Sequence, residues 1–362
     1  MISRQDILIE VKNLYSVYES NDSHPLFILN DVNMEIQKGK TIGIIGESGS
    51  GKTQLVSSMF GIQSLKPGVI YGDVQINING RKFSVYEKNG KSDDALINPL
   101  KVNKRVSPKM NRIKREMIGF IPQDPKTFLN PFWNIEKLFY QSYRLDYNNS
   151  LSFDKFISKH LVSAGIKKEK VDTIKYKTPN ELSGGEAQRV MVGFILSKSP
   201  TIIIADEPTT GVDVTTQTRI IETLKELNTE DRTIIIISHD LGLLDHLIDE
   251  YFVVYAGFVI EHIRNKENLY NPEMLHPYTR KIVHSLNRNN FTENPGSDII
   301  YKHEEQLKNC PFSSPGLCDI FSKYQDDPNY EFTNKCSTDL PEQVINYNGE
   351  NSGWIRCWYK KQ

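Results

Sequence analysis

The sequence predicts an α/β fold built around a parallel β-sheet, and three observations carry this prediction. Uninterrupted apolar runs at residues 202–205 and 233–237 have the composition of strands that are buried on both faces. A helical pattern lies between them at residues 216–227, and parallel strands need such a crossover. A third apolar run, Thr41–Ile45, leads through a glycine-rich turn into residues 54–60, where apolar side chains recur four apart.

The other elements follow from their own patterns. Residues 7–18 and 26–36 alternate apolar and polar side chains, which predicts paired strands with one solvated face. Residues 72–80 are predicted to form a further strand, and residues 134–170 to be mainly helical. Residues 81–111 are polar and basic, so we interpret them as an insertion.

Composition narrows the class of protein. The chain has 362 residues, of which 38% are hydrophobic and 25% charged, which suits one large globular domain with an extension. Its apolar runs fall short of the roughly 18–20 residues that a membrane span needs, and the N-terminus has no signal core, so we expect neither a span nor export. The formal net charge of -1 argues against nucleic acid as a partner. Residues 81–115 hold eleven Lys and Arg against three acids, which fits a solvated insertion or attraction to anionic lipid headgroups.

Residues 46–53, GESGSGKT, match the phosphate-loop pattern in full, between a strand and a helix. Glycines let the backbone N–H groups point at phosphate oxygens, and the helix that follows adds its positive end. We expect Lys52 to reach the β and γ phosphates of ATP and the Thr53 hydroxyl to coordinate Mg²⁺. The predicted nucleotide-binding residues here are Gly46, Ser48, Gly49, Ser50, Gly51, Lys52 and Thr53.

Two carboxylates follow the apolar run at 202–205. Asp206 stands at the end of that strand, where it can hold Mg²⁺, and Glu207 is placed to polarise an attacking water as a general base. His239 follows the next strand and could contact the γ-phosphate. These roles depend on the phosphate loop being present, because either pattern alone is a weak signal.

Residues 182–188, LSGGEAQ, open a second helix with a serine and two glycines, which makes another phosphate-sized site of bare N–H groups. One chain rarely needs two such sites unless the second serves a nucleotide on another subunit. This stretch resembles the signature motif of the ABC ATPase superfamily. The resemblance implies a P-loop NTPase (RecA-like) core, an antiparallel β subdomain and a helical signature subdomain. It also implies that two cassettes pair head to tail, so that Ser183, Gly184 and Gly185 complete the partner's site.

Three more positions take roles from the same resemblance. Gln123 looks like the glutamine-loop residue that contacts Mg²⁺ and the attacking water and faces the membrane partner. Asp213, in TGVD, resembles the aspartate that crosses the dimer interface, although Gly211 and Val212 replace the usual Ala and Leu. Tyr18 lies where the superfamily has an aromatic ring stacked on adenine, and Tyr15 is the alternative.

Three stretches resemble one branch, the ATP-binding subunits of bacterial oligopeptide, dipeptide and nickel permeases. They are QDPKTFLNP at 123–131, YAG at 255–257 and HPYT at 276–279. The branch implies an ATPase at the cytoplasmic face of the membrane that energises import of di- or oligopeptides. Its implied partners are a second ABC ATPase, homologous or identical, two membrane-spanning permease subunits and, indirectly, an extracytoplasmic solute-binding protein. Nickel or another small solute, or a soluble ABC ATPase without transport, remain the alternatives.

The four cysteines all lie beyond residue 309, where the pattern has loosened. We place a boundary at about 265, between a nucleotide-binding domain (1–265, helical subdomain about 124–190) and an irregular C-terminal extension (266–362). In this branch the tail often carries an iron–sulfur cluster, which implies a [4Fe–4S] site on four thiolates. Zinc and unliganded thiols stay open, although no CxxC spacing occurs. The candidate ligands are Cys310, Cys318, Cys336 and Cys357.

Overall fold

The computed structural model divides the chain into two compact units. The first unit comprises residues 1–37, 42–110 and 239–362, and the second comprises 38–41 and 111–238. The structure describes residues 7–20, 24–62, 66–78, 80–87, 95–122, 124–145, 150–210, 214–228, 232–239, 245–271, 275–286, 344–345 and 353–357.

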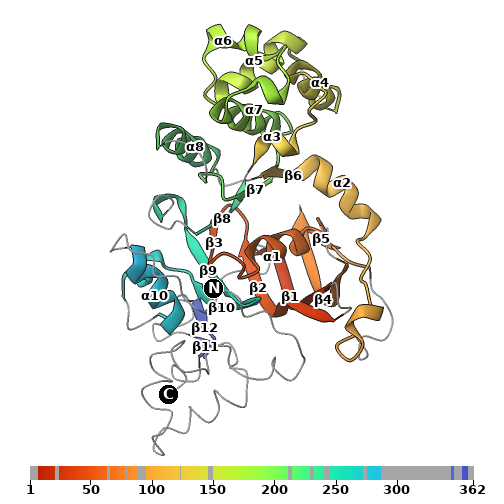
Figure 1. The fold of residues 1–362 in the computed structure, drawn as a ribbon, viewed down its shortest axis with the longest axis vertical. Helices are drawn as coiled ribbons and strands as arrows, with labels where there is room; N and C mark the ends of the chain where they lie inside the picture. Colours follow the sequence, from red (N-terminus) through yellow and green to blue (C-terminus); the bar gives the residue numbers. More distant parts are fainter. Residues whose placement is uncertain are drawn as a thin grey trace, which may run out of the picture. The chain divides into compact units, whose positions relative to one another are not determined.

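The first unit contains a four-stranded antiparallel sheet in the order β2-β1-β4-β5. Strand β1 (Ile7–Glu19) pairs with β2 (Pro25–Gln37) on one side and β4 (Pro67–Ile78) on the other. The predicted alternation is confirmed, since Val11 and Val17 of β1 are buried while the neighbouring Lys12 and Tyr18 are exposed. Helix α1 (Lys52–Met59) lies against β2 and β4 (Figure 1).

Part of the predicted insertion belongs to this sheet. Strand β5 (Arg81–Ser84) pairs antiparallel with β4, with Gln75 opposite Ser84. A short 3-10 helix, η1 (Pro99–Lys101), and helix α2 (Pro108–Met117) follow. Residues 81–84 are exposed or half-buried, so an edge strand here does not need the apolar alternation on which the prediction was based.

Five further described strands of the first unit neighbour one another in the order β11-β12-β10-β9-β3, as part of a larger sheet. Strand β3 (Thr41–Ile45) is parallel to β9 (Glu250–Tyr255), which forms a hairpin with β10 (Phe258–Ile263). Every residue of these three strands is buried. The short strands β12 (Gly353–Ile355) and β11 (Val344–Ile345) extend the sheet from β10. Helices η3 (Asp245–Leu247), η4 (Lys266–Tyr270) and α10 (Pro277–Leu286) complete the described part of this unit.

The second unit combines parallel strands with a group of helices. Strand β7 (Ile202–Asp206) lies between β6 (Ile118–Ile121) and β8 (Thr233–Ser238), and both pairs are parallel. The pairing of β7 with β8 was predicted, whereas β6 was not. The helices are α3 (Pro125–Phe128), α4 (Ile135–Leu145), α5 (Phe153–Ser163), α6 (Lys168–Ile174), η2 (Pro179–Glu181), α7 (Gly184–Leu196) and α8 (Val214–Leu227).

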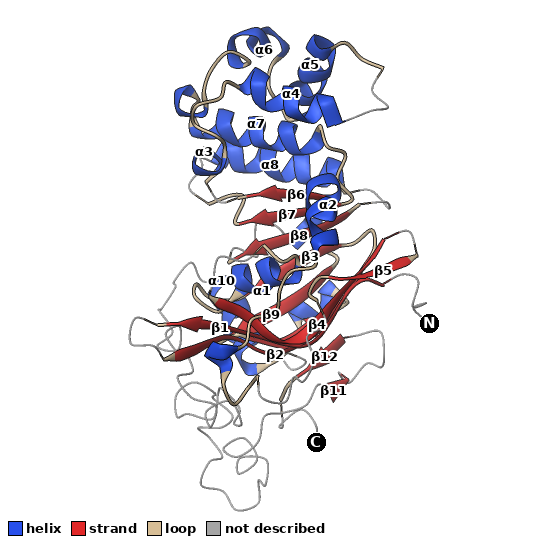
Figure 2. Cartoon of the chain, turned by 90° about the vertical axis from the view of Figure 1, so that its right-hand side faces the viewer, coloured by secondary structure: helices blue, strands red, loops and turns tan. Residues whose placement is uncertain are grey.

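Helix α7 is central to the helical group of the second unit. It contacts α3, α4 and α5, while α6 packs on α5. Figure 2 shows these helices gathered beyond the strands β6, β7 and β8 of the same unit. The prediction that residues 134–170 are mainly helical is therefore confirmed. Within the described residues, no helix is both long and apolar enough to span a bilayer.

Candidate functional site

The phosphate loop joins β3 to α1, and its backbone needs glycine at defined points. Gly46 has a φ of +153°, and a Cβ placed on it would lie 2.2 Å from the carbonyl oxygen of Val254. Gly51 has a φ of +102° and forms the N-cap of α1. Both conformations are strained for any residue with a side chain. The predicted glycine-rich turn at a helix start is therefore present, and a helix start of this kind favours an anion.

Of the last two side chains of the loop, Lys52 is buried and Thr53 is exposed. Lys52 is 6% exposed, and its Nζ donates hydrogen bonds to the carbonyl oxygens of Gly46 at 2.8 Å and Glu47 at 2.7 Å. The loop thus holds its own ammonium group next to the backbone. Thr53, the second residue of α1, is exposed. An exposed hydroxyl that follows a buried cation in the sequence, on a glycine-rich loop, fits ATP with Mg²⁺.

Strand β7 delivers the predicted carboxylates of the second unit. Asp206 is its last residue and pairs in register with Ile237 of β8. Glu207 has a φ of +45°, which is uncommon for a residue with a side chain. Its backbone N–H donates to the carbonyl oxygen of Ile237 at 2.9 Å, and its Oε2 accepts a hydrogen bond from the Thr210 hydroxyl at 3.1 Å. Such strain persists where surrounding contacts hold it, and it often accompanies function.

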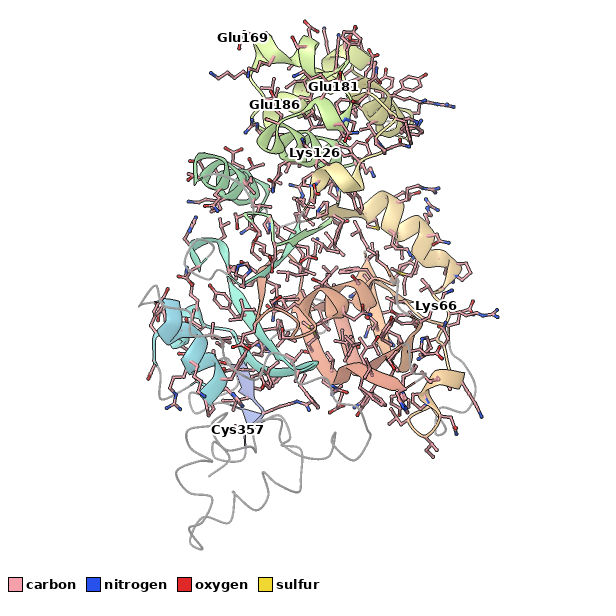
Figure 3. The ribbon with its side chains drawn as sticks, in the orientation of Figure 1. Lys66, Lys126, Glu169, Glu181, Glu186 and Cys357 are labelled. Carbon is pink, nitrogen blue, oxygen red and sulfur yellow. The ribbon has the colours of Figure 1, made fainter. Side chains whose placement is uncertain are left out.

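The signature stretch begins α7 with a capping box. The Ser183 hydroxyl oxygen accepts from the Glu186 N–H at 3.2 Å, and Glu186 Oε2 accepts from the Ser183 N–H at 3.0 Å. This backbone hydrogen bond is the main cause that lowers the pKa of Glu186. Ser183 and Gly184 are exposed, and a Cβ on Gly184 would meet nothing within 4 Å. Figure 3 shows Glu186 among the helices of the second unit.

Several predicted residues can be located individually. Tyr18 of β1 is 39% exposed, whereas the ring of the alternative, Tyr15, packs edge-on against Tyr71 with centroids 5.9 Å apart. Tyr18 is therefore the more exposed of the two side chains, and its stacking on adenine stays a prediction. His239, the residue after β8, is exposed. Gln123 and Asp213 lie outside the described residues, and their predicted roles stay predictions.

The cysteine prediction can be followed at one position only. Cys357 is 8% exposed and lies two residues beyond β12; its side chain is labelled in Figure 3. Cys310, Cys318 and Cys336 lie outside the described residues. In the part of the chain that the structure describes, no three His, Cys, Asp or Glu side chains gather as a metal site. The predicted cluster is therefore not tested, and the same holds for the boundary at 265.

Sequence reasoning missed two contacts with the predicted motifs. The side-chain amide of Gln188 donates to the carbonyl oxygen of Pro208, which links the signature helix to the residue after Glu207. The hydroxyl oxygen of Tyr278 accepts a hydrogen bond from the backbone N–H of Glu47. Neither contact has a local sequence signal, because the partners are 20 and 231 residues apart.

Comparison with known proteins decides the family. The family model described as "ABC transporter" matches residues 29–210, which include the phosphate loop, the signature stretch and Glu207. The chain belongs to the ABC transporter family. It is an ABC ATPase of the oligopeptide branch, as the following relatives indicate.

The chain is 34% identical over 356 residues to the oligopeptide transport ATP-binding protein OppD of Haemophilus influenzae, and the match covers 97% of each. It is 30% identical to OppD of Lactococcus lactis subsp. cremoris, covering 80% of this chain and 76% of the relative. A putative peptide import ATP-binding protein of Brucella ovis is 30% identical, and the match covers 88% of this chain and 87% of that relative.

Solved structures of this ABC family agree with the fold. The ATP-binding cassette MJ0796, in a dimeric post-hydrolysis state bound to ADP and phosphate, matches with a TM-score of 0.55 and 25% identity. The match covers 71% of this chain and 98% of that one. The protein cbiO1 from Clostridium perfringens, part of an ABC transporter complex, matches with a TM-score of 0.54 and 25% identity. That match covers 78% of this chain and 97% of cbiO1. The predicted cassette fold with its antiparallel sheet is confirmed.

Proposed function

We propose that this ABC ATPase is the ATP-hydrolysing subunit of a membrane importer for di- or oligopeptides. The observation that carries the proposal is the end-to-end similarity to an oligopeptide transport ATP-binding protein, which covers 97% of both chains. The phosphate loop and the exposed start of α7 add support. An ATPase that works as a pair needs one site that binds its own ATP and a second that completes the ATP site of the partner. Nickel or another small solute as cargo, and a soluble role without transport, are the alternatives to be excluded.

The proposed half-site assigns one task to each side chain. Bound ATP with Mg²⁺ supplies the γ-phosphate that is transferred to water. Lys52 would leave its carbonyl partners to neutralise the β and γ phosphates, and Thr53 and Asp206 would hold the metal ion. Glu207 would accept the proton of the attacking water. The hydrogen bond from the Thr210 hydroxyl orients the Glu207 carboxylate. Gln123 and His239 would contact the water and the γ-phosphate, and Tyr18 would stack on adenine.

Pairing with a second cassette completes the proposed site. Ser183, Gly184 and Gly185 would meet the γ-phosphate on the partner, and Asp213 would cross the interface. The exposure of Gly184 at the start of α7 supports this, since its N–H belongs to the positive end of the helix, whereas the Ser183 N–H already donates to Glu186. The structurally similar MJ0796 is described as dimeric. We propose a homologous second ATPase as the partner, and a homodimer is the competing outcome.

The second unit offers support for a membrane partner. Phe132 is 90% exposed and Phe128 is 59% exposed, both close after the predicted glutamine loop. Aromatic side chains are enriched at protein interfaces relative to the rest of the surface. We propose that they contact two membrane-spanning permease subunits at the cytoplasmic face of the membrane. An extracytoplasmic solute-binding protein would act through those subunits.

We also propose that residues 1–265 form the nucleotide-binding domain and residues 266–362 an extension that holds a [4Fe–4S] cluster. The thiol of Cys357 supports this, because it is buried and close to the sheet of the first unit. The ligand set would be Cys310, Cys318, Cys336 and Cys357, with a structural rather than electron-transferring role.

Uptake of a labelled oligopeptide by cells that lack this gene tests the transport proposal. Restoration by the wild-type chain is expected, and Lys52→Ala should not restore uptake because the phosphates lose their cation. Exposed Lys159→Ala is the matched control and should restore it. Purification from a detergent extract should bring down multi-span proteins and a second ATPase. If the wild-type chain restored uptake of nickel but not of peptide, the proposed peptide cargo would be wrong. If no membrane proteins co-purified with the chain, a soluble role would be favoured.

A further inference from the structure

Residues 276–279, His-Pro-Tyr-Thr, begin helix α10, and no part of the proposed half-site uses them. Tyr278 is 2% exposed. Its hydroxyl oxygen accepts a hydrogen bond of 2.9 Å from the backbone N–H of Glu47, the second residue of the phosphate loop. A segment 231 residues further along the chain is therefore bonded directly to the loop that is expected to hold ATP.

The Tyr278 ring is fixed in a neutral form that suits this bond. The pKa of its hydroxyl is raised far above neutral pH. Burial is the main cause, and the negative charge of the nearby Glu47 carboxylate is the second. The phenol therefore stays protonated, and its oxygen remains available to the Glu47 N–H. The ring of Tyr255 packs against it with centroids 4.6 Å apart and an interplanar angle of 56°. Tyr255 is itself 3% exposed, so the Tyr278 ring has little room to swing away.

A fully buried carboxylate holds the segment that carries Tyr278. Both oxygens of Glu261, on β10, accept from the backbone N–H of His276, at 3.1 and 3.2 Å. The Thr279 hydroxyl donates to the same carboxylate. The ring Nδ1 of His276 accepts from the Tyr278 N–H at 3.1 Å, which closes the turn. Burying a carboxylate is unfavourable unless it is hydrogen-bonded, so these donors make Glu261 a firm anchor for the start of α10.

The phosphate loop has a second outside contact, from the turn between β9 and β10. The backbone N–H of Gly257 donates to the carbonyl oxygen of Ser50 at 2.9 Å. Gly257 has a φ of +80°, and a Cβ on it would lie 2.3 Å from the carbonyl oxygen of Ile28. Glu47 and Ser50 are thus both held from outside the loop, on either side of Ser48 and Gly49.

We propose that Tyr278 is a positioning residue for nucleotide binding, held by Glu261, and that it fixes the curve of the phosphate loop through Glu47. The inference rests on the proposed function, because it requires the loop to bind ATP. Glu47 also supplies one of the two carbonyl oxygens that hold Lys52. An anchored Glu47 therefore sets the starting position of the cation as well as the direction of the loop amides. A loop that is already ordered loses less conformational entropy when the phosphates bind.

The variant Tyr278→Phe in the full-length chain removes one oxygen and tests the proposal. Titration calorimetry should show ATP with Mg²⁺ binding about three- to tenfold more weakly, which corresponds to about 0.6–1.4 kcal/mol. The matched control is Tyr86→Phe. Tyr86 is 1% exposed, and its hydroxyl donates to the carbonyl oxygen of Ser58 at 2.5 Å, near the other end of α1. The control loses the same atom from an equally buried ring, and its ATP affinity should match the wild type.

Hydrogen exchange of the Glu47 amide in the nucleotide-free chain supplies a readout that general stability does not mimic. Slow exchange in the wild type and faster exchange in Tyr278→Phe, but not in Tyr86→Phe, are expected. Fast exchange at Glu47 in the wild type overturns the inference even if the variant does not fold. Equal ATP affinity in wild type and Tyr278→Phe, or equal losses in both variants, also overturns it. A wild-type chain that does not bind ATP overturns the proposed function itself.

Discussion

The side chain of Gln188 donates a hydrogen bond to the backbone carbonyl oxygen of Pro208. Gln188 is the last residue of the signature stretch and is 1% exposed, whereas Pro208 follows the strained Glu207. The second unit therefore fastens the start of the signature helix to the segment that presents the proposed general base. A substitution in the signature stretch is therefore expected to shift the position of Glu207 in the same chain.

We predict that Gln188→Leu lowers ATP turnover by about tenfold or more, because a misplaced base is poorly oriented toward water. The buried Pro208 carbonyl would also lose its donor, which should lower the free energy of unfolding by about 1–3 kcal/mol. Ser197→Ala is the control, since Ser197 is buried at the other end of α7 and bonds to Ser142 instead. Steady-state ATPase assays and urea denaturation measure both effects. A Gln188→Leu protein with wild-type turnover would show that the link has no catalytic consequence.

Local patterns predicted the central strands and the loop motifs of this ABC ATPase. The apolar run Thr41–Ile45 coincides with β3, and residues 216–227 lie within α8. Strand β5 was missed because its Arg81 and Lys82 are solvated at a sheet edge, where apolar alternation is not required. The positive φ of Glu207 could not be foreseen either. It depends on the bond to Ile237, which only the packed sheet brings into reach.

Glu207→Gln should reduce ATP hydrolysis in the assembled complex by about 100-fold or more, because the amide cannot accept the proton of the attacking water. ATP affinity should persist, since the amide oxygen can still accept from the Thr210 hydroxyl. Exposed Glu222→Gln on α8 is the control and should hydrolyse ATP normally. Single-turnover hydrolysis and equilibrium binding separate the two quantities. Undiminished turnover by Glu207→Gln would remove this residue from the mechanism.

Acid should destabilise the chain through His262. Burial lowers the pKa of His262 despite the 2.9 Å hydrogen bond to Glu250, so the folded chain holds this ring neutral more firmly than the unfolded chain does. The unfolded state then binds more protons below about pH 6.5. This stabilising contribution is complete above that pH and is lost as the pH falls toward the lower folded-state pKa.

Urea denaturation between pH 5 and 8 measures this effect. His262→Phe, which preserves stacking on Phe252, should flatten the decline in the free energy of unfolding on the acid side. Exposed His24→Gln should leave the decline as it is in the wild type. A decline that is as steep in His262→Phe as in the wild type would mean that other groups cause it.

Phe132→Asp should weaken association with membrane subunits, because it places a charge on a side chain that is 90% exposed and proposed to be buried in the complex. ATP binding by the separate chain should not change. Ile97→Asp, at a position 67% exposed in the first unit, is the control and should co-purify normally. Co-purification from detergent extract, quantified against the chain itself, gives the result. Equal recovery of membrane proteins with both variants would exclude Phe132 from the interface.

Cys357 should contribute to bound iron, and its surroundings explain why. The backbone N–H of the preceding Arg356 donates to the carbonyl oxygen of Ile260, and its guanidinium donates to Asp31 at 2.9 Å. These bonds fix the backbone beside Cys357 on the first unit, which prepares one ligand before a cluster binds.

Anaerobically purified wild type should contain about four iron and four acid-labile sulfide per chain, and Cys357→Ser should lose most of both. Arg356→Lys keeps the thiol and the charge but not the planar guanidinium, so its iron content should fall less. Zinc in place of iron, or iron that is unaffected by Cys357→Ser, would contradict the proposed four-thiolate cluster. Because ATP binding is proposed to depend on residues 46–53, Cys357→Ser should still bind ATP, and this separates loss of a cluster from loss of the fold.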